Sequence, residues 1–289
     1  MNEYVIIIGA MKSGTTTLFE LLAQHPAIAP ASNKEPGFFA LDEIWDKGFD
    51  WYQSLFAFDP SVHKYRLEAS TDYTKYPFVE NVWGRMTSRD DVSVRLIYIM
   101  RHPFRRLESH ARHVQGARKE LGQRLSLRPD HSLDAGLSQI SLAASQYAAQ
   151  IETFRPALDQ GRLHLLTFEE LRADPDGCMA GILDFLGLDP TATLETLPVY
   201  NAAGSKRRAH PLWARATQVD GLMALGRNTM PSGLRSWIKG RLEPKITVEG
   251  RFKLTAEEEA QLQLLYREDL RQLRHEFGID TAGLWGLEP

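Results

Sequence analysis

The stretch from Tyr4 to Gln24 decides the fold, and it reads YVIIIGAMKSGTTTLFELLAQ. Its first five residues are apolar and mostly β-branched, which is typical of a buried parallel strand. Gly9 ends that run, and three leucines then recur at helical spacing, so we expect a helix to begin near Thr15. A strand, a glycine loop and a helix in this order form a phosphate cradle, because loop amides and the positive helix end both face an anion.

This cradle departs from the nucleotide-triphosphate loop in one position. Gly9 and Gly14 have the spacing of that motif, but Thr15 stands where the motif requires lysine, and Lys12 lies inside the loop instead. A lysine at that place can stabilise charge on a leaving group, so we assign Lys12 a catalytic role. The residues expected to hold the anion are Lys12, Ser13, Gly14, Thr15, Thr16 and Thr17. The plain alternative is a capped helix after a core strand, with a surface lysine.

The run GAMKSGTTTL resembles the 5′-phosphosulfate loop of sulfotransferases that use 3′-phosphoadenosine 5′-phosphosulfate (PAPS). The pattern is most similar to that of the heparan-sulfate and bacterial carbohydrate branch. The resemblance implies a single α/β domain with a central, mostly parallel sheet flanked by helices. It also implies transfer of a sulfuryl group to an acceptor hydroxyl, or less favourably an amine, with the 3′,5′-diphosphate (PAP) as product.

A second motif, NKEPGFF from Asn33 to Phe39, follows the first helix. In the heparan-type enzymes a Lys-Glu followed by a Phe-Phe pair stands here, and the glutamate is the general base. The resemblance therefore implies that Glu35 removes the acceptor's proton, and that Lys34 and Phe38 lie at the acceptor. The chemistry needs such a group, because the hydroxyl must lose its proton as it attacks sulfur. A solvated loop glutamate is the alternative.

The expected strand Tyr65–Ala69 leads into Ser-Thr-Asp-Tyr, where we place Asp72 and Tyr73 at the acceptor. The family has a Glu-Lys-Ser/Thr-Pro pattern here, and its lysine helps to hold the substrate. Ala69 replaces that lysine, which weakens the case for a heparan-like anionic acceptor. The aromatic stretch Phe49–Phe56 is expected to pack beneath this region.

A third motif follows the expected strand Ser93–Met100. Arg101 stands at the carboxyl end of that strand, where open α/β sheets bind ligands, and Ser109 lies two helical turns further on. An arginine fork and a hydroxyl can together hold a phosphate monoester. The arrangement matches the family's 3′-phosphate site, which separates PAPS from ATP or GTP. The alternative is an arginine paired with an acid such as Glu108.

A basic segment lies near the C-terminus. The range 206–253 has eleven Lys and Arg against three Asp and Glu, a local charge of +8 in a chain of net charge −3. Such a segment favours an anionic partner, and a small charged cofactor fits better than nucleic acid, for which the chain has no recognisable motif. Heparan-type enzymes carry a Ser-Lys-Gly-Arg loop over the 3′-phosphate, which implies the same role for Lys206, Arg207 and Arg208, with Arg207 replacing the glycine.

The remaining elements complete one expected domain, 1–289. A helix is predicted over Ile140–Leu158, a strand over Arg162–Thr167, a helix that ends near Phe185, and an amphipathic helix over Leu254–Phe277. Residues 212–250 have no clean period, and we interpret them as a lid, an insertion or a partner-docking segment.

Composition narrows the class of protein. No stretch approaches the roughly 20 apolar residues of a membrane span, and Tyr4–Ile8 is too short for a signal peptide. Cys178 is the only cysteine, so no intrachain disulfide forms, and the expected compartment is the cytoplasm. We expect no metal. The rival hypotheses are a nucleotide kinase or triphosphatase and a silent anion-binding protein. A small-molecule, sugar or lipid-like acceptor and a homo-oligomer stay open.

Overall fold

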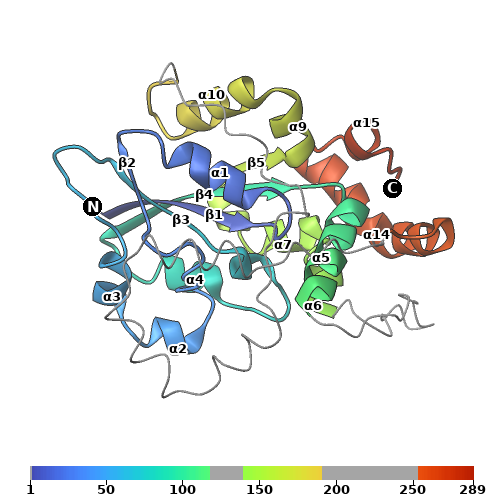
Figure 1. The fold of residues 1–289 in the computed structure, drawn as a ribbon, viewed down its shortest axis with the longest axis horizontal. Helices are drawn as coiled ribbons and strands as arrows, with labels where there is room; N and C mark the ends of the chain where they lie inside the picture. Colours follow the sequence, from blue (N-terminus) through green and yellow to red (C-terminus); the bar gives the residue numbers. More distant parts are fainter. Residues whose placement is uncertain (1, 118–138, 191–252) are drawn as a thin grey trace, which may run out of the picture. The chain divides into compact units, whose positions relative to one another are not determined.

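Five strands form one sheet in the order β2-β3-β1-β4-β5 (Figure 1). Every neighbouring pair is parallel. The strands are β1 Asn2–Gly9, β2 Ile28–Pro30, β3 Tyr65–Ala69, β4 Val92–Met100 and β5 Leu163–Thr167. The predicted strands and the parallel α/β fold class are confirmed. β1 lies at the centre, as expected for the most apolar run of the chain.

The computed structural model describes residues 2–117, 139–190 and 253–289. They belong to one unit, which comprises Met1–Tyr200 and Phe252–Pro289. The expected single domain over 1–289 and the suggested lid over 212–250 stay predictions, because the second range lies outside the described residues. Within the part of the chain that is described, no helix is long and apolar enough to cross a membrane.

Side chains of β1 alternate between two hydrophobic cores, one on each face of the sheet. Tyr4, Ile6 and Ile8 point into one core, whereas Val5 and Ile7 point into the other. This two-residue period is the geometry of a strand, and burial on both faces explains why the run reads as continuously apolar in the sequence.

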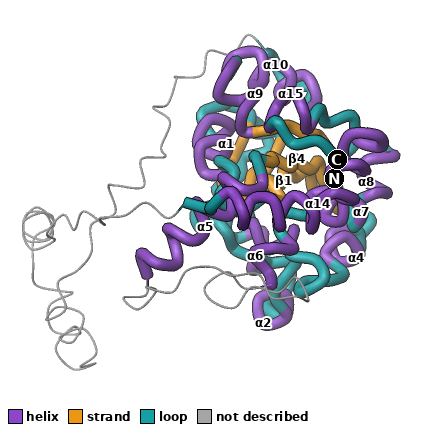
Figure 2. The backbone as a smooth tube through the Cα atoms, turned by 90° about the vertical axis from the view of Figure 1, so that its right-hand side faces the viewer, coloured by secondary structure: helices purple, strands orange, loops and turns teal. Residues whose placement is uncertain are grey.

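Helices cover both faces, as the alternation of strands and helices predicts (Figures 1 and 2). One core takes residues from α1 Thr15–Leu22, α9 Phe168–Ala173 and α10 Pro175–Phe185. The larger core takes residues from α2 Asp42–Trp45, α3 Phe49–Gln53, α4 Val82–Met86, α5 Pro103–Ala117, α6 Gln139–Ala143, α7 Tyr147–Glu152, α8 Arg155–Asp159, α14 Ala256–Phe277 and α15 Thr281–Trp285, and from the 3-10 helix η1 Thr71–Thr74.

The chain reverses its direction across the sheet at β1. From β1 it builds β2 and β3 on one side, and it then crosses over to build β4 and β5 on the other. In open α/β sheets ligands bind at such a switch point, outside the carboxyl ends of the central strands, here β1 and β4. Because all five strands are parallel, the described loops that carry predicted site residues, after β1, β2, β3 and β4, leave this same edge.

The predicted helix over Ile140–Leu158 is wrong as a single element, since the structure breaks it into α6, α7 and α8. Its buried stripe is right: Tyr147, Ile151 and Phe154 are in the core. The first break occurs where the chain turns to bind Arg106, which donates to the Ser145 hydroxyl at 2.6 Å. A proline in the first turn of α8 restarts the helix after the second break.

Candidate active site

The loop after β1 packs so closely against its neighbours that both glycines are required. A Cβ at Gly9 would lie 2.0 Å from the Thr74 hydroxyl oxygen. Gly14 has φ of 96°, and a Cβ there would lie 2.7 Å from the Phe168 ring. Position 14 requires a positive φ and has no room for a Cβ, and only glycine meets these two conditions. The loop backbone is therefore held against β4 and α9 with little freedom.

The N-terminus of α1 is open to an anion. Gly14 caps the helix without a side-chain hydrogen bond, and the first turn contains no acidic residue. No side chain among the described residues caps the first amides of the helix, and the helix dipole favours a negative group there. Of the predicted hydroxyls, Thr16 is exposed, Thr15 and Thr17 are buried, and Ser13 is fully buried with no hydrogen-bond partner for its hydroxyl among the described residues.

Arg101 joins the two predicted phosphate sites. Its guanidinium donates to the backbone carbonyl of Lys12 at 3.2 Å and lies over the Phe168 ring, 4.8 Å from the ring centroid. The Tyr147 hydroxyl donates to the Arg101 carbonyl at 2.6 Å and fixes the backbone there. Burial lowers the pKa of Arg101 from its ordinary value, but an arginine stays protonated at neutral pH. The structure thus brings the Lys12 loop and Arg101 together.

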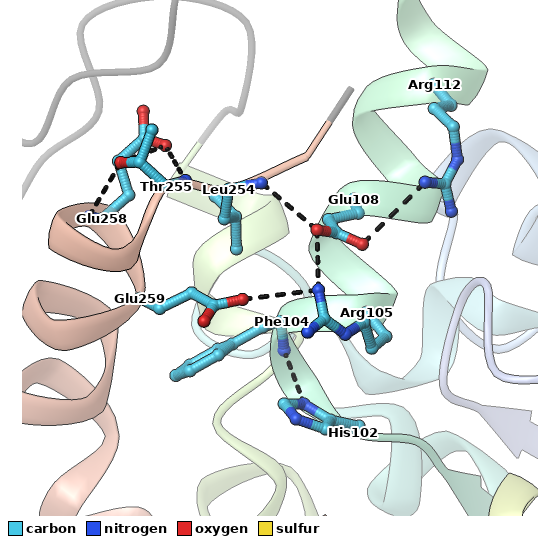
Figure 3. Close-up of polar contacts among 9 residues, drawn as sticks. All are labelled: His102, Phe104, Arg105, Glu108, Arg112, Leu254, Thr255, Glu258 and Glu259. Atoms are coloured by element: carbon cyan, nitrogen blue, oxygen red, sulfur yellow. Dashed lines mark hydrogen bonds and ion pairs between the residues drawn. The ribbon is translucent and has the colours of Figure 1, made fainter. Parts of the chain in front are cut away.

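Glu108 is not the partner of Arg101 in the described part of the chain. Figure 3 shows the Glu108 carboxylate between Arg105, Arg112 and the backbone of Leu254, at 2.8, 3.9 and 3.2 Å. This nearly buried acid ties α5 to the start of α14, so its role is structural. The alternative interpretation of Arg101 as one half of a Glu108 ion pair therefore loses its support. Ser109, the next residue along α5, is partly buried.

Two residues near Arg101, Phe168 and Glu169, are not among the predicted site residues. Phe168 supports the Arg101 guanidinium and touches the loop at Gly14. Glu169 accepts from the His102 amide at 3.2 Å and from the Trp285 indole at 3.1 Å. The charge of Glu169 also favours the protonated form of Arg101. Their signal was the Phe-Glu pair directly after β5, where a strand of a parallel sheet delivers side chains to the ligand edge.

Glu35 lies on the loop that follows β2. Its backbone has φ of 65°, and its exposed carboxylate forms an ion pair with Lys34. Behind it, the Gly37 amide donates to the Ser70 hydroxyl at 3.0 Å and the Phe39 amide donates to the Tyr73 hydroxyl at 3.4 Å. These bonds attach the loop to the end of β3, beside the β1 loop.

The four residues predicted to contact the acceptor have different environments. Phe38 and Tyr73 are buried, 1% and 2% exposed, and they pack beneath the loop rather than lining a surface. Asp72 and Lys34 are partly exposed. Asp72 forms an ion pair with Lys75 and lies beside Gly37, with a carboxylate oxygen 3.7 Å from the position of a Cβ there. Lys75, which sequence reasoning missed, places a cation directly after η1, paired with Asp72.

The pKa of His110 responds to the positive charges of this region. Burial, followed by the positive charges of Arg106, Lys12 and other neighbours that include Lys75, lowers its pKa to about 4. Its Nδ1 lies 2.7 Å from the Ser141 hydroxyl. His102 also has a pKa of about 4, mainly through burial, and its Nδ1 accepts from the Phe104 amide at 3.3 Å (Figure 3). Both imidazoles are therefore neutral at pH 7. Their pKa values lie in the range where carboxylates ordinarily titrate.

Two further predictions, on the basic loop and on a metal, stay predictions. Lys206, Arg207 and Arg208 lie outside the described residues, so their contact with a phosphate stays a prediction. Among residues 2–117, 139–190 and 253–289, no group of three or more His, Cys, Asp or Glu side chains is placed to hold a metal ion.

The comparisons with known proteins agree with this geometry. The family described as "Sulfotransferase domain" matches residues 2–271. Mouse heparan sulfate glucosamine 3-O-sulfotransferase 3B1 is 31% identical over 195 residues, which cover 63% of this chain and 45% of that protein. Mouse heparan sulfate glucosamine 3-O-sulfotransferase 5 is 25% identical over 229 residues, covering 71% and 64%. The chain spans about half the length of the first of these curated relatives.

One solved structure supports the fold along the whole chain. The crystal structure of a sulfotransferase from Alicyclobacillus acidocaldarius superposes with a TM-score of 0.64 and 19% sequence identity. The match covers 98% of this chain and 99% of that one. At this identity the likeness concerns the fold alone.

The charge cluster predicts the titration of His110. We expect an NMR titration to give its imidazole a pKa near 4, and Lys75→Met to raise that pKa because one positive neighbour is removed. The exposed Lys47 is not among the charges acting on His110, so Lys47→Met is the matched control and should leave the pKa unchanged. A wild-type pKa near 6.5 that does not respond to Lys75→Met would contradict the charge cluster.

Proposed function

The chain belongs to the sulfotransferase domain family, and on that premise we propose that it transfers the sulfuryl group of PAPS to an acceptor hydroxyl and releases PAP. An amine is the second acceptor class. The observation that carries the proposal is the contact between Arg101 and the Lys12 carbonyl. It puts a loop suited to one phosphate group beside an arginine suited to another, and a 3′,5′-substituted adenosine presents two such groups.

The residues at the carboxyl ends of β1 and β4 suit this ligand. The amides at the start of α1 and the half-buried Lys12 would hold the 5′ end, while Arg101 and Ser109 would hold the 3′-phosphate. The Arg101 Nε and the Ser13 hydroxyl have no hydrogen-bond partner among the described residues, so polar groups remain for an anion to satisfy. When bound, PAPS supplies a sulfuryl group on a bridging oxygen, and the bond between that oxygen and sulfur is the one that breaks.

The chain's own groups supply the charge and the base. Lys12 stands inside the loop and would balance the negative charge that develops on the leaving oxygen. Glu35, exposed beside Lys34, would take the proton of the acceptor hydroxyl. Positioning and charge stabilisation are the main contributions that a protein makes to such an in-line displacement.

The acceptor is proposed as a small-molecule, sugar or lipid-like compound that carries a hydroxyl. The mouse relatives are named for heparan sulfate glucosamine, and this chain has Ala69 where that branch carries a substrate-binding lysine. Lys75, which follows η1, is paired with Asp72, so the cation that this segment offers is already neutralised by a carboxylate. This balance favours an acceptor with less negative charge than heparan sulfate.

The two rivals predict different behaviour. A kinase or triphosphatase would bind a triphosphate with magnesium through a lysine directly after Gly14, where this chain has Thr15. A silent anion-binding protein would bind PAP without turnover. Ligand preference therefore distinguishes a sulfotransferase from a kinase or triphosphatase. Catalysis distinguishes it from a silent anion-binding protein.

Ligand preference is tested by thermal unfolding. PAP should raise the melting temperature far more than ATP with magnesium does, because it engages two phosphate sites. At a hundred times its Kd a ligand adds about 2.7 kcal/mol to the free energy of unfolding. Ser109→Ala should reduce the shift given by PAP and leave that given by 5′-AMP nearly unchanged, whereas Arg101→Ala should reduce both shifts, because Arg101 also holds the Lys12 loop. The exposed Arg89, which pairs with Asp91, provides the control Arg89→Ala. Equal stabilisation by PAP and by ATP with magnesium would overturn the proposal. A strict need for magnesium in the binding of PAP would overturn it as well.

Catalysis is tested by the roles assigned to two residues. Glu35→Gln keeps the shape of the side chain but removes the base, so turnover of labelled PAPS with a competent acceptor should fall by roughly a hundredfold or more. The affinity for PAP should stay within a few-fold. Lys12→Ala should lower both turnover and PAP affinity, because the lysine also touches the ground state.

The exposed Glu43 of α2 gives the matched control, and Glu43→Gln should have no effect. Normal turnover in Glu35→Gln would place the base elsewhere, and His110 is then the first candidate. A pH profile alone does not separate the two, because the pKa of His110, at about 4, lies in the range typical of carboxylates.

A further inference from the structure

Glu68 is a buried carboxylic acid that the proposed reaction does not use. It is the penultimate residue of β3, pairs in register with Ile6 of β1, and is fully buried. Tyr65, Leu67 and Ala69 of the same strand belong to the core beneath α1 and α10. Because side chains alternate along a strand, Glu68 points to the opposite face of the sheet, into the larger core.

Three hydroxyl groups face the Glu68 carboxyl group, from Tyr52, Tyr73 and Ser70. Neither carboxyl oxygen has a well-formed hydrogen bond to a described residue. Burial raises the pKa of Glu68 to about 8, and the facing hydroxyls oppose this rise without overcoming it. The acid is therefore protonated at pH 7, because burial outweighs the three hydroxyls and no described cation is among the groups that shift its pKa.

The same three residues hold the loop that carries Glu35. The Ser70 hydroxyl accepts from the Gly37 amide, and the Tyr73 hydroxyl accepts from the Phe39 amide. The Tyr52 ring stacks on Phe38, with 4.5 Å between ring centroids and 6° between ring planes. Each of the three side chains that hold this loop, Ser70, Tyr73 and Tyr52, thus also faces Glu68.

We propose that Glu68 is a positioning residue whose protonated form orders the segment Glu35–Phe39 through Ser70, Tyr52 and Tyr73. An ionised carboxylate would need stronger hydrogen bonds than it has in this site. It would obtain them by drawing the hydroxyls toward itself or by admitting water. Either movement displaces Ser70 and Tyr73 from the two amides that they hold, and the loop loosens. The link to catalysis rests on the proposed function, in which Glu35 is the base.

The other groups around Glu68 do not change charge in the same range. The titratable side chains that face it are Tyr52 of α3, Tyr73 of η1 and Tyr4 of β1. The charged Arg66 lies on the same face of β3, two residues earlier, and its guanidinium stacks on the Tyr4 and Phe58 rings, 5.4 and 3.6 Å from their centroids. Burial raises the pKa of Tyr52 and Tyr73 well above 10 and that of Tyr4 to about 12. All three stay neutral up to pH 9, so Glu68 is the group in this cluster that ionises near pH 8.

The raised pKa has a direct consequence for stability. The folded protein keeps the Glu68 proton at pH values where the unfolded chain has lost it. The associated stability is fully present below about pH 4.5 and is lost as the pH rises through 8. Asp269 of α14 behaves in the same sense, with its pKa raised to about 7 by burial. It is present in wild type and in Glu68 variants alike, so it cancels in their comparison.

Hydrogen–deuterium exchange of the full chain without ligand tests the proposal. The amides of Gly37 and Phe39 are compared in wild type and Glu68→Gln, which mimics the protonated acid. At pH 6 their protection should agree within a few-fold. At pH 9, one unit above the pKa, ionised Glu68 outnumbers protonated Glu68 by about ten to one, so wild type should be about tenfold less protected than Glu68→Gln.

Asp269→Asn is the matched control for a buried acid outside this network. It should shift the pH dependence of global stability without changing the exchange of the two amides. The same pH dependence of their exchange in wild type and Glu68→Gln would overturn the proposal. If Glu68→Gln fails to fold, that outcome also contradicts it, because a neutral isostere should preserve the structure.

A second variant and a catalytic measurement complete the test. Glu68→Asp shortens the side chain but keeps it ionisable, so it should loosen the loop already at pH 6. With labelled PAPS and a competent acceptor, kcat of wild type should fall above pH 8 while the affinity for PAP stays constant, and Glu68→Gln should remove that fall. Hydrogen–deuterium exchange needs no turnover, so it tests the positioning role of Glu68 even if the protein does not catalyse the proposed reaction. PAP binding tests the proposed cofactor independently of Glu68.

Discussion

The hydrogen bond from Arg101 to the backbone carbonyl of Lys12 is the contact on which the site depends. It joins the loop after β1 to the end of β4, the two strands between which the chain reverses its direction across the sheet. Phe168 supports both partners, because its ring lies under the Arg101 guanidinium and against Gly14. The phosphate-binding elements are therefore set by the packing of the sheet itself, before any ligand arrives.

The acceptor half of the site is built on a different principle. The loop that carries Glu35 has no regular structure, and it is held from behind by hydroxyls and rings that rest on a buried acid, Glu68. On the phosphate side, burial and the positive charges around His110 together lower its pKa to about 4. In the proposed reaction, the cationic half would bind the anionic donor, and the half held by neutral, buried polar groups would bind the acceptor.

Sequence reasoning found the elements whose signals are local. The strands, the glycine loop and the helix at Thr15 follow from period and composition, and Arg101 follows from its place at a strand end. It missed the break of the helix over 140–158 and the roles of Glu68, Lys75 and Glu169, because these depend on contacts between residues far apart in the chain. It also placed Phe38 and Tyr73 at the acceptor, whereas burial puts them beneath the loop.

A crystal structure of the protein with the 3′,5′-diphosphate tests the central claim most directly. The account predicts the 5′-phosphate at the amides that open α1, beside Lys12, and the 3′-phosphate within hydrogen-bond distance of Arg101 and Ser109. It also predicts that the bond from Arg101 to the Lys12 carbonyl is retained. A diphosphate that engages only the glycine loop, or a 3′-phosphate turned away from Arg101, would contradict the account.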